Sequence, residues 1–450
     1  MSQHSFDVLV IGTGGGGSVA ARKCAAAGKK VAIVDALPFG GTCALRGCDP
    51  KKVLVGAAET VARSRQLLGH GVAQEAIISW PELMAFKRTF TESVPEKKEA
   101  GFQKAGIHTF HGVARFTGPH TVQIDADVLE AKQFVIATGA RPQPLGIPGE
   151  ELLLDSTDFM ELPELSADLT FVGGGYIAFE FAHLAARAGA KVRILHRGAR
   201  PLENFEPELV EHLLVATREA GIEVVLNTEV KRLTRTPDGQ LRLHAETDGQ
   251  AREFTASLAF HAAGREPALA DLNLEAAGVA YTRRGVTVNE YLQSTSHPDV
   301  YAAGDAAASG LPLTPVAGKA SQVAAANLLE GNHQVIDYGL MPSAVFAHPV
   351  LASVGLGEAE ATRQGLKFQV KHDVTTGWFT SKRLRTPRSA FKVLIEEETD
   401  LILGAHLLGP NAEEVINLFM LAMHAKLPAT EVRKLIFAYP TASSDITYML

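Results

Sequence analysis

The stretch that decides the fold lies at residues 6–35 and reads FDVLVIGTGGGGSVAARKCAAAGKKVAIVD. An apolar run leads into a first glycine-rich loop, in which Gly12, Gly14 and Gly17 form a G-x-G-x-x-G pattern, and an alanine-rich segment then leads to a second apolar run. This order predicts strand, loop, helix and strand. Asp35 follows Gly12 by twenty-three positions, where a carboxylate can accept a hydrogen bond from a ribose hydroxyl. The stretch therefore predicts a Rossmann-type site for an adenine dinucleotide.

A second copy of this pattern lies at residues 168–196, which read DLTFVGGGYIAFEFAHLAARAGAKVRILH. Gly173 and Gly175 belong to the second glycine-rich loop, again between an apolar run and an alanine-rich segment. At the offset where the first copy has an acid, this copy has a basic cluster, which consists of His196, Arg197 and Arg200. Basic side chains at that place accommodate a 2′-phosphate. We therefore expect one site for a dinucleotide without this phosphate and one site for NADPH.

The composition of the 450-residue chain is that of a globular protein, with 46% hydrophobic and 21% charged residues and a formal net charge of -7. The mild negative charge argues against nucleic acid as the main partner. No uninterrupted apolar run reaches the roughly 20 residues that span a bilayer. The start of the chain lacks the pattern of a secretory signal. A cytoplasmic protein without a membrane partner is therefore expected.

The rest of the sequence predicts a mixed α/β architecture. Helices are expected over 51–68, 81–105, 412–426 and 430–437, and short strands over 107–137. The helix at 412–426 is apolar on almost every side, which indicates burial in a subunit interface as much as in a core.

Two of the three cysteines, Cys43 and Cys48, stand five positions apart. Three cysteines cannot form a disulfide framework. A structural zinc site would need four ligands, and no second cluster is present, so no metal site is expected. Cys24 lies within the alanine-rich segment after the first loop and is expected to be a small core residue.

The cysteine pair lies in a segment, residues 40–52, that reads GGTCALRGCDPKK. This segment resembles the redox-active motif of the class I pyridine nucleotide-disulfide oxidoreductases, which include glutathione reductase, dihydrolipoamide dehydrogenase and mercuric reductase. The resemblance extends over essentially the whole chain. Further matches are Ala137-Thr138-Gly139, Gly173 to Glu180, Ala303-Gly304-Asp305, Leu313-Thr314-Pro315 and Gly404-Ala405-His406.

The resemblance implies two Rossmann-like domains and a C-terminal α+β dimerisation domain. The implied domains are an FAD-binding domain at 1–144 and 265–335, an NAD(P)H-binding domain at 145–264 and a dimerisation domain at 336–450. FAD is implied at the first loop and at matching positions, namely Gly41, Thr42, Thr138, Gly139, Gly304, Asp305 and Thr314. NADPH is implied at the second loop, with Gly264 among its contacts and the ring of Tyr176 gating the nicotinamide pocket.

The family's chemistry then implies roles for several side chains. Hydride would pass from NADPH to FAD, beside which Lys51 and Glu180 would form an ion pair. Electrons would enter a Cys43–Cys48 disulfide, in which Cys48 is the sulfur against the flavin and Cys43 the sulfur that exchanges with substrate. A homodimer is implied as well.

The chain departs from the family at its C-terminus. The partner-subunit motif H-P-T-x-x-E is replaced here, because Tyr439 stands at the histidine position and Ser444 at the glutamate position. Tyrosine, with a usual pKa near 10, is a poor base near pH 7. Mercuric reductases also have a tyrosine at this position. They carry a C-terminal cysteine pair as well, and this pair is missing from the present chain. Arg22 matches a glutathione contact, whereas Gln322 replaces a second arginine.

These observations favour an FAD-dependent, NADPH-preferring enzyme that reduces a small disulfide or another electrophile that tolerates the missing base. A metal-ion or quinone reductase of the mercuric reductase type is the first alternative. A redox-sensing flavoprotein of low turnover is the second alternative.

Overall fold

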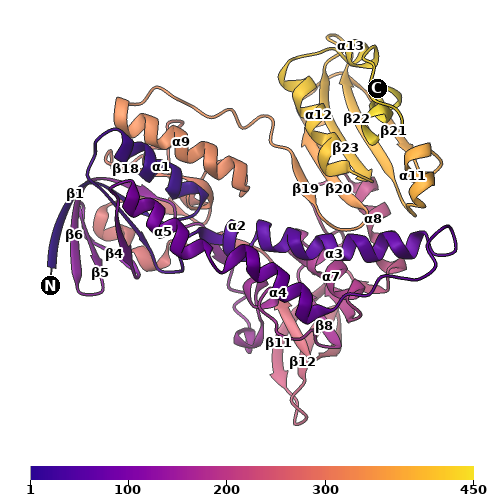
Figure 1. Ribbon diagram of the computed structural model, residues 1–450, viewed down its shortest axis with the longest axis horizontal. Coiled ribbons are helices and arrows are strands. Elements are labelled where there is room, and N and C mark those ends of the chain that lie inside the picture. The colour runs from indigo at the N-terminus through magenta and orange to yellow at the C-terminus, as the bar shows by residue number, and fades with distance from the viewer. Residues whose placement is uncertain (1) are drawn as a thin grey trace. The chain divides into compact units, whose positions relative to one another are not determined.

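The computed structural model describes residues 2–450 (Figure 1) and comprises two compact bodies. The first body contains residues 2–52, 85–143 and 265–338, and the second contains residues 53–84, 144–264 and 339–450. The chain crosses between them within two helices, α3 (Cys48–Gln66) and α4 (Trp80–Thr91), and again at two loops and near Tyr338. Both bodies are therefore assembled from segments that are distant in sequence.

The first body is built on a seven-stranded sheet in the order β3-β2-β1-β6-β5-β4, with β18 also paired to β6. Its parallel strands are β1 (Ser2–Ile11), β2 (Val31–Asp35), β3 (His108–His111), β6 (Asp127–Ile136) and β18 (Val300–Ala302). Antiparallel pairing adds β4 (Ala114–Gly118) and β5 (Thr121–Ile124). The predicted strand-loop-helix-strand order of residues 6–35 is confirmed by β1, helix α1 (Gly15–Ala26) and β2.

Helix α1 packs against α9 (Thr314–Glu330) through small side chains. Ala20, Ala21, Ala320 and Ala324 are buried at this contact, where short side chains permit close packing. The Ser321 hydroxyl accepts a hydrogen bond from the Ala20 amide at 2.9 Å. This contact fixes the N-terminal end of α9 in the same body as the first loop.

The remaining elements of the first body are short. They are α2 (Gly41–Arg46), α5 (Val94–Lys104), β7 (Ala140–Pro142) paired with β15 (Arg265–Pro267), and β16 (Tyr281–Thr282) paired with β17 (Gly285–Val286). The expected helix over 81–105 is in fact two helices, α4 and α5, because Pro95 at the start of α5 cannot continue a preceding helix. The helix over 51–68 and the strands over 107–137 are confirmed.

The second body contains the second glycine-rich loop on a four-stranded parallel sheet in the order β10-β9-β8-β14. The strands are β8 (Asp168–Val172), β9 (Lys191–Leu195), β10 (Ile222–Val225) and β14 (Leu258–His261), with helices α6 (Ser156–Phe159), α7 (Tyr176–Arg187) and α8 (Pro207–Glu219). A three-stranded antiparallel sheet adds β11 (Thr228–Arg235), β12 (Leu241–Thr247) and β13 (Gln250–Ala256). The second Rossmann-type repeat is thereby confirmed.

The C-terminal part of the second body is a five-stranded antiparallel sheet in the order β19-β20-β23-β22-β21. Its strands are β19 (Ser343–Val345), β20 (Val350–Gly355), β21 (Phe368–Val374), β22 (Ala390–Glu396) and β23 (Ile402–Gly409). Its helices are α10 (Glu358–Arg363), α11 (Phe379–Leu384), α12 (Ala412–His424), α13 (Ala429–Arg433) and α14 (Ile446–Met449). One face of α12 packs on the sheet, yet Leu421 on the same helix is 56% exposed, so an apolar surface of this helix is left uncovered.

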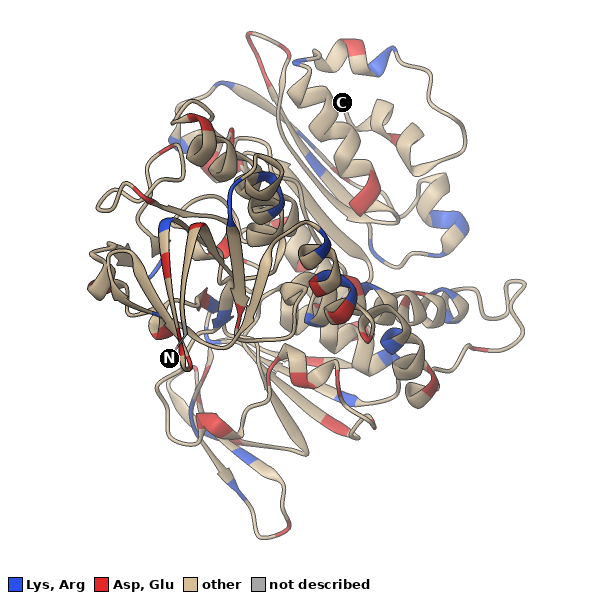
Figure 2. Cartoon of the chain, turned by 60° about the vertical axis from the view of Figure 1, so that its left-hand side comes forward, with Lys and Arg blue, Asp and Glu red and all other residues tan. Residues whose placement is uncertain are grey.

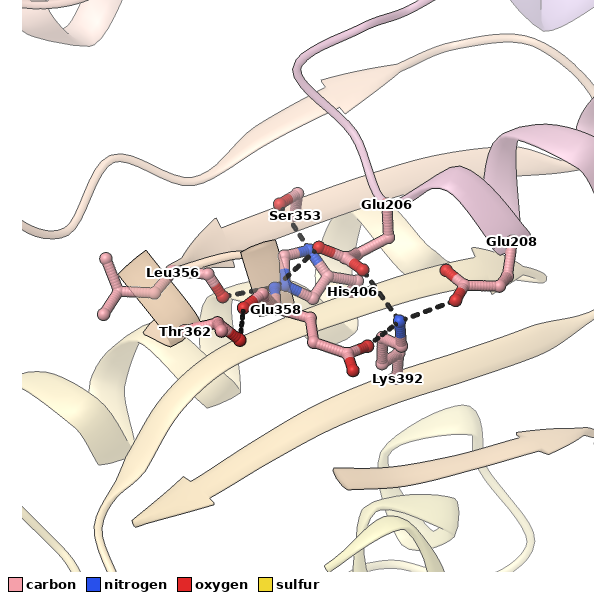
Figure 3. Close-up of polar contacts among 8 residues, drawn as sticks. All are labelled: Glu206, Glu208, Ser353, Leu356, Glu358, Thr362, Lys392 and His406. Carbon is pink, nitrogen blue, oxygen red and sulfur yellow. Dashed lines mark hydrogen bonds and ion pairs between the residues drawn. The ribbon is translucent and has the colours of Figure 1, made fainter. Parts of the chain in front are cut away.

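A buried charge cluster joins α8 to the antiparallel sheet within the second body (Figure 3). The Lys392 ammonium on β22, 3% exposed, donates to Glu206 and Glu208 at 2.9 Å each and also to Glu358. Burial alone would disfavour the charge, but the three carboxylates raise the pKa of Lys392 above its usual value. Removing one partner from such a buried cluster is strongly destabilising, because it leaves charge uncompensated.

Charge elsewhere is mixed. Figure 2 shows basic and acidic residues interspersed along the helices and loops in view. Among residues 2–450, no helix is both long and apolar enough to cross a membrane.

Candidate active site

The first loop is shaped by glycines that leave no room for a side chain. Gly12 has φ of +113°, and a Cβ atom there would lie 2.1 Å from the Ala137 carbonyl oxygen. A Cβ atom on Gly41, at φ of +74°, would lie 2.3 Å from the Gly14 Cα atom. The backbone at the start of α1 is therefore not covered by side chains, and its N–H groups can donate to a pyrophosphate.

Asp35 lies at the end of β2 and is tied to this loop. One carboxylate oxygen accepts from the Thr13 amide at 2.8 Å and from the Thr13 hydroxyl at 2.6 Å. The other oxygen accepts from the Leu37 amide at 3.0 Å. A carboxylate offers about four acceptor positions, so Asp35 retains capacity for a ribose hydroxyl.

Three further features of the first body fit a bound flavin dinucleotide. The Thr138 hydroxyl oxygen is buried without a hydrogen-bond partner among the described residues, and a ligand would satisfy it. Burial raises the pKa of Asp305, although Arg265 acts in the opposite direction. Gly139 and Gly304 both have positive φ, which lets the backbone approach a ligand closely. The predicted FAD residues of the first body therefore fit that cofactor.

The two cysteines meet where α2 gives way to α3. Cys43 lies on α2, and Cys48 is the first residue of α3. Both thiols are free and are hydrogen-bonded to each other. The Cys43 thiol also donates to Asp49 at 3.8 Å, and the Cys48 sulfur lies 3.4 Å from the Thr314 hydroxyl. Residues 40–52 thus bring together the sulfur pair that the sequence predicts.

The electrostatics make the two sulfurs unequal. The hydrogen bond from Cys43 lowers the pKa of Cys48 to about 6, assisted by Thr314 and Lys51 and opposed by burial. The same contact raises the pKa of Cys43, and burial and Asp49 add to that shift. The pair therefore holds a thiolate on Cys48 and a thiol on Cys43 near pH 7. Burial raises the pKa of Cys24 to about 11, which fits its expected place in the core.

Lys51 lies in the first body and Glu180 in the second, so their predicted ion pair stays a prediction. Within the second body, Glu180 is buried on α7, and its carboxylate accepts from the Phe346 amide at 2.9 Å. This bond fixes the orientation of the Glu180 side chain.

One turn further along α7 lies the buried His183, a residue that sequence reasoning missed. It contacts the loop that contains Phe346 and His348. The His183 Nδ1 atom accepts from the His348 amide at 3.2 Å and lies 2.9 Å from the Arg187 guanidinium. His183 Nε2 therefore carries the hydrogen, which it donates to Thr217 at 3.0 Å. Burial, with Arg187 adding to it, lowers the pKa of both His183 and His348. The spacing of Glu180, His183 and Arg187 along one helix face was the available signal.

The second loop repeats the geometry of the first. Gly173 has φ of +119°, and a Cβ atom there would lie 2.2 Å from the Ala262 carbonyl oxygen. Gly264 also has positive φ, at +121°. Tyr176 is the first residue of α7 and is 46% exposed, while Gly175 precedes it as the N-cap. An accessible ring at the start of this helix fits the role predicted for Tyr176.

Side chains of the basic cluster after β9 donate hydrogen bonds to backbone carbonyls of the same segment. His196 donates from Nε2 to the Arg200 carbonyl at 2.9 Å, and Arg200 donates to the Glu203 carbonyl at 3.1 Å. Arg197 is exposed. Burial lowers the pKa of His196, and the negative charge of Glu203, a residue that no sequence pattern indicates, opposes this shift.

In the C-terminal segment, Ser444, which replaces the glutamate of the family motif, has a local structural role. The Thr441 hydroxyl accepts from the Ser444 amide at 3.1 Å, and Ser444 accepts from the Thr441 amide at 3.2 Å. Ser444 therefore completes a capping box. Tyr439 is 74% exposed and Ile436 fully exposed. In the first body, the Arg22 guanidinium lies over the Phe102 ring, 5.0 Å from its centre. This cation–π contact accounts for the arginine without a role in glutathione binding.

Comparison with known proteins identifies the family. Residues 6–321 match the family described as pyridine nucleotide-disulphide oxidoreductase, and residues 341–450 match its dimerisation domain. The chain belongs to this family. Its members are flavoproteins that act on sulfur groups of donors, and the glutathione reductase relatives of this chain use FAD and NADPH. The dimerisation domain supports a homodimer.

Several relatives cover nearly the whole chain. Glutathione reductase of Burkholderia cepacia is 33% identical over 99% of this chain and 98% of its own length. Mercuric reductase of Bacillus cereus is 31% identical over 98% of this chain and 70% of its own length. The HOCl-induced flavoprotein disulfide reductase RclA of Escherichia coli, solved as a Cu(II) complex, has a TM-score of 0.88 and 27% identity, covering 100% of this chain and 99% of the other. The oxidoreductase fold is thereby confirmed.

Proposed function

We propose that this oxidoreductase carries electrons from NADPH through FAD to Cys43 and Cys48, and from this pair to a small-molecule disulfide. The observation that carries the proposal is the contact between two free thiols of opposite pKa shift, beside Thr314 and within reach of Lys51. A thiolate held next to a thiol is the reduced form that a dithiol relay needs. FAD, when bound, accepts a hydride from NADPH and delivers two electrons to a disulfide.

Residues of the chain then complete the exchange with substrate. Cys43, the exchanging sulfur that the family resemblance implies, passes its proton to the neighbouring Cys48 thiolate and attacks the substrate disulfide. A mixed disulfide forms, and the substrate thiolate that leaves takes the proton back from Cys48. The Cys48 thiolate then attacks Cys43, which closes the Cys43–Cys48 disulfide and releases the second substrate thiol. Asp49 and the Cys48 thiolate are the groups that face the Cys43 proton. Lys51 lowers the pKa of Cys48 and so helps to hold the thiolate.

A second candidate, reduction of a soft metal ion, is supported by the exposed Tyr439 in place of a base and by the relatives. Mercuric reductase and the Cu(II) complex of RclA are both similar to this chain. Within residues 2–450 there is no group of three or more His, Cys, Asp or Glu side chains suited to a metal ion, so such an ion would meet the two thiols alone. Soft ions favour thiolate ligands.

Anaerobic reduction tests the relay. One equivalent of NADPH is expected to produce two titratable thiols and a long-wavelength band from the Cys48 thiolate beside oxidised flavin. Because the pKa of Cys48 is lowered to about 6, the band should persist above that pH and disappear as the pH falls through it. Cys48→Ser should abolish the band, whereas Cys24→Ala, which changes a buried thiol of α1, should not. Full bleaching of the flavin without the band, unchanged by Cys48→Ser, would exclude the relay.

A substrate screen separates the two candidates. Steady-state NADPH oxidation is measured with glutathione disulfide, lipoamide, other thiol disulfides, quinones, Hg(II) and Cu(II). A disulfide reductase that lacks an acid-base histidine should gain turnover from Tyr439→His, because imidazole is about three pKa units closer to neutrality than phenol. A metal-ion reductase should not gain from this change. Absence of turnover with every acceptor would favour a redox-sensing flavoprotein.

A further inference from the structure

His196 stands at the ribose position of the second loop with one ring nitrogen fixed and the other open. Its Nε2 atom lies 2.9 Å from the Arg200 carbonyl oxygen. A carbonyl can only accept, so Nε2 carries the hydrogen and the neutral ring presents a lone pair at Nδ1. Among residues 2–450, no side chain or backbone group is hydrogen-bonded to Nδ1. The ring therefore has a free acceptor at Nδ1 when neutral and a free donor there when protonated.

The ring is held against the glycine-rich loop itself. A Cβ atom on Gly174 would lie 2.6 Å from His196 Nδ1, which places this nitrogen directly over the loop. The backbone of His196 is fixed on both sides, because its amide donates to Val225 at 2.9 Å and its carbonyl accepts from Thr228 at 2.8 Å. Neither Gly174, Val225 nor Thr228 carries a titratable group. The charge state of the ring is thus set by the segment that follows it.

Two charged side chains in that segment, Arg197 and Glu203, act on His196, and a third residue, Arg200, contacts the ring through its backbone carbonyl. Burial lowers the pKa of His196, and the Arg197 charge lowers it further. The hydrogen bond to the Arg200 carbonyl and the Glu203 carboxylate act in the opposite direction. Arg200 itself is turned to the Glu203 carbonyl at 3.1 Å. The ring is therefore mainly neutral at pH 7 and gains its charge only below the usual pKa of imidazole.

We infer that the protonation state of His196 sets the preference of this enzyme between NADPH and NADH. The neutral ring accepts a hydrogen bond from the ribose 2′-hydroxyl at Nδ1, as the carboxylate at this position does in other dinucleotide sites, and so admits NADH. The protonated ring donates from Nδ1 to the 2′-phosphate and adds a positive charge beside Arg197. This inference rests on the placement of NADPH at the second loop in the proposed function.

Equilibrium binding of adenosine fragments to the FAD-loaded enzyme tests the inference without turnover. The dissociation constants of 2′,5′-ADP and 5′-AMP are measured by calorimetry at pH 5.5 and pH 7.5. A charge-assisted hydrogen bond contributes enough to change affinity roughly tenfold. The ratio of 2′,5′-ADP affinity to 5′-AMP affinity should therefore rise about tenfold at the lower pH, relative to a variant that cannot titrate. The same comparison should show proton uptake when 2′,5′-ADP binds.

His196→Gln supplies the matched control, because the phosphate also titrates, with a second pKa of about 6. Phosphate ionisation affects both proteins equally and strengthens binding at high pH, opposite to the effect of the imidazole. Glu203→Gln should move the transition to lower pH, since the carboxylate raises the pKa of His196. The same pH dependence in wild type and His196→Gln would overturn the inference while leaving the proposed function intact. Failure of both fragments to bind at either pH would overturn the NADPH placement as well.

Discussion

The two glycine-rich loops share one backbone and differ at their second position. In the first loop this position is Thr13, whose amide and hydroxyl both donate to Asp35. In the second loop it is Gly174, and the ring of His196 occupies the space where a side chain would lie. The same strand-loop-helix frame thus holds an acid in one body and an imidazole in the other. The residue between the first two glycines therefore decides which ribose-binding group fits at the end of the next strand.

The largest effect should come from the glycines that the two loops have in common. Gly12→Ala would place a methyl group 2.1 Å from the Ala137 oxygen, and Gly173→Ala would place one 2.2 Å from the Ala262 oxygen. We expect Gly12→Ala to lose its flavin and Gly173→Ala to keep the flavin but lose NADPH binding by 100-fold or more, on the order of 3 kcal/mol. Flavin absorbance per protein and calorimetry with NADPH measure these outcomes.

Two glycines with open surroundings serve as controls for that experiment. Gly318 on α9 and Gly377 have no atom within 4 Å of an added Cβ atom and no positive φ. Gly318→Ala and Gly377→Ala should retain both cofactors. Loss of flavin from Gly173→Ala would show that the two loops do not divide the cofactors as proposed.

Asp35→Ala should weaken FAD binding next most strongly. It removes the acceptor for both donors of Thr13 and for the Leu37 amide, so the loop and the ribose contact are loosened together. Each buried polar group left unpaired costs about 1–3 kcal/mol, so the FAD dissociation constant should rise roughly 10- to 100-fold. Reconstitution of the apoprotein, followed by flavin fluorescence, gives this constant. Asp7→Asn, a surface change at the pair with Lys132, is the control.

Arg197→Ala should lower the ratio of kcat/KM for NADPH to that for NADH, by about tenfold. An exposed arginine beside a phosphate gives a charge-assisted contact worth about 1.5 kcal/mol. Initial rates with the two cofactors at pH 7.5 and low ionic strength measure the ratio. An unchanged ratio would remove Arg197 from the phosphate site and leave His196 and Arg200.

The smallest effect tests the difference at the second position. The backbone at Gly174 has a conformation that any residue can adopt, so Gly174→Ala adds no backbone strain. The new methyl group would lie 2.6 Å from the His196 ring and displace it. We expect a several-fold weaker binding of 2′,5′-ADP at pH 5.5, with less change for 5′-AMP. Thr13→Ala is the counterpart in the first loop and should weaken FAD binding to a similar extent. Equal effects of Gly174→Ala on both fragments would mean that the ring does not contact the 2′ position.

The sequence alone predicted both dinucleotide loops, the cysteine pair and the family, because their spacing is dictated by local backbone geometry. Gly12, Gly173 and the Cys43–Cys48 segment lie where they were predicted, and the structure adds the reason in carbonyl contacts and thiol electrostatics. His183 was signalled only by its spacing with Glu180 and Arg187, because its partner, the His348 amide, lies 165 positions away. Glu203 acts on His196 by its charge, which no motif indicates.

The lysine cluster of Figure 3 has a consequence for recombination among relatives. Glu206 and Glu208 belong to the segment of the second Rossmann-type sheet, whereas Lys392 on β22 and Glu358 on α10 belong to the C-terminal segment. A chimera that exchanged only one of these segments could leave the buried Lys392 ammonium without its carboxylates, or the buried Glu206 carboxylate without its ammonium. A crossover between the two segments should therefore be tolerated only where the donor sequence carries the complementary charges.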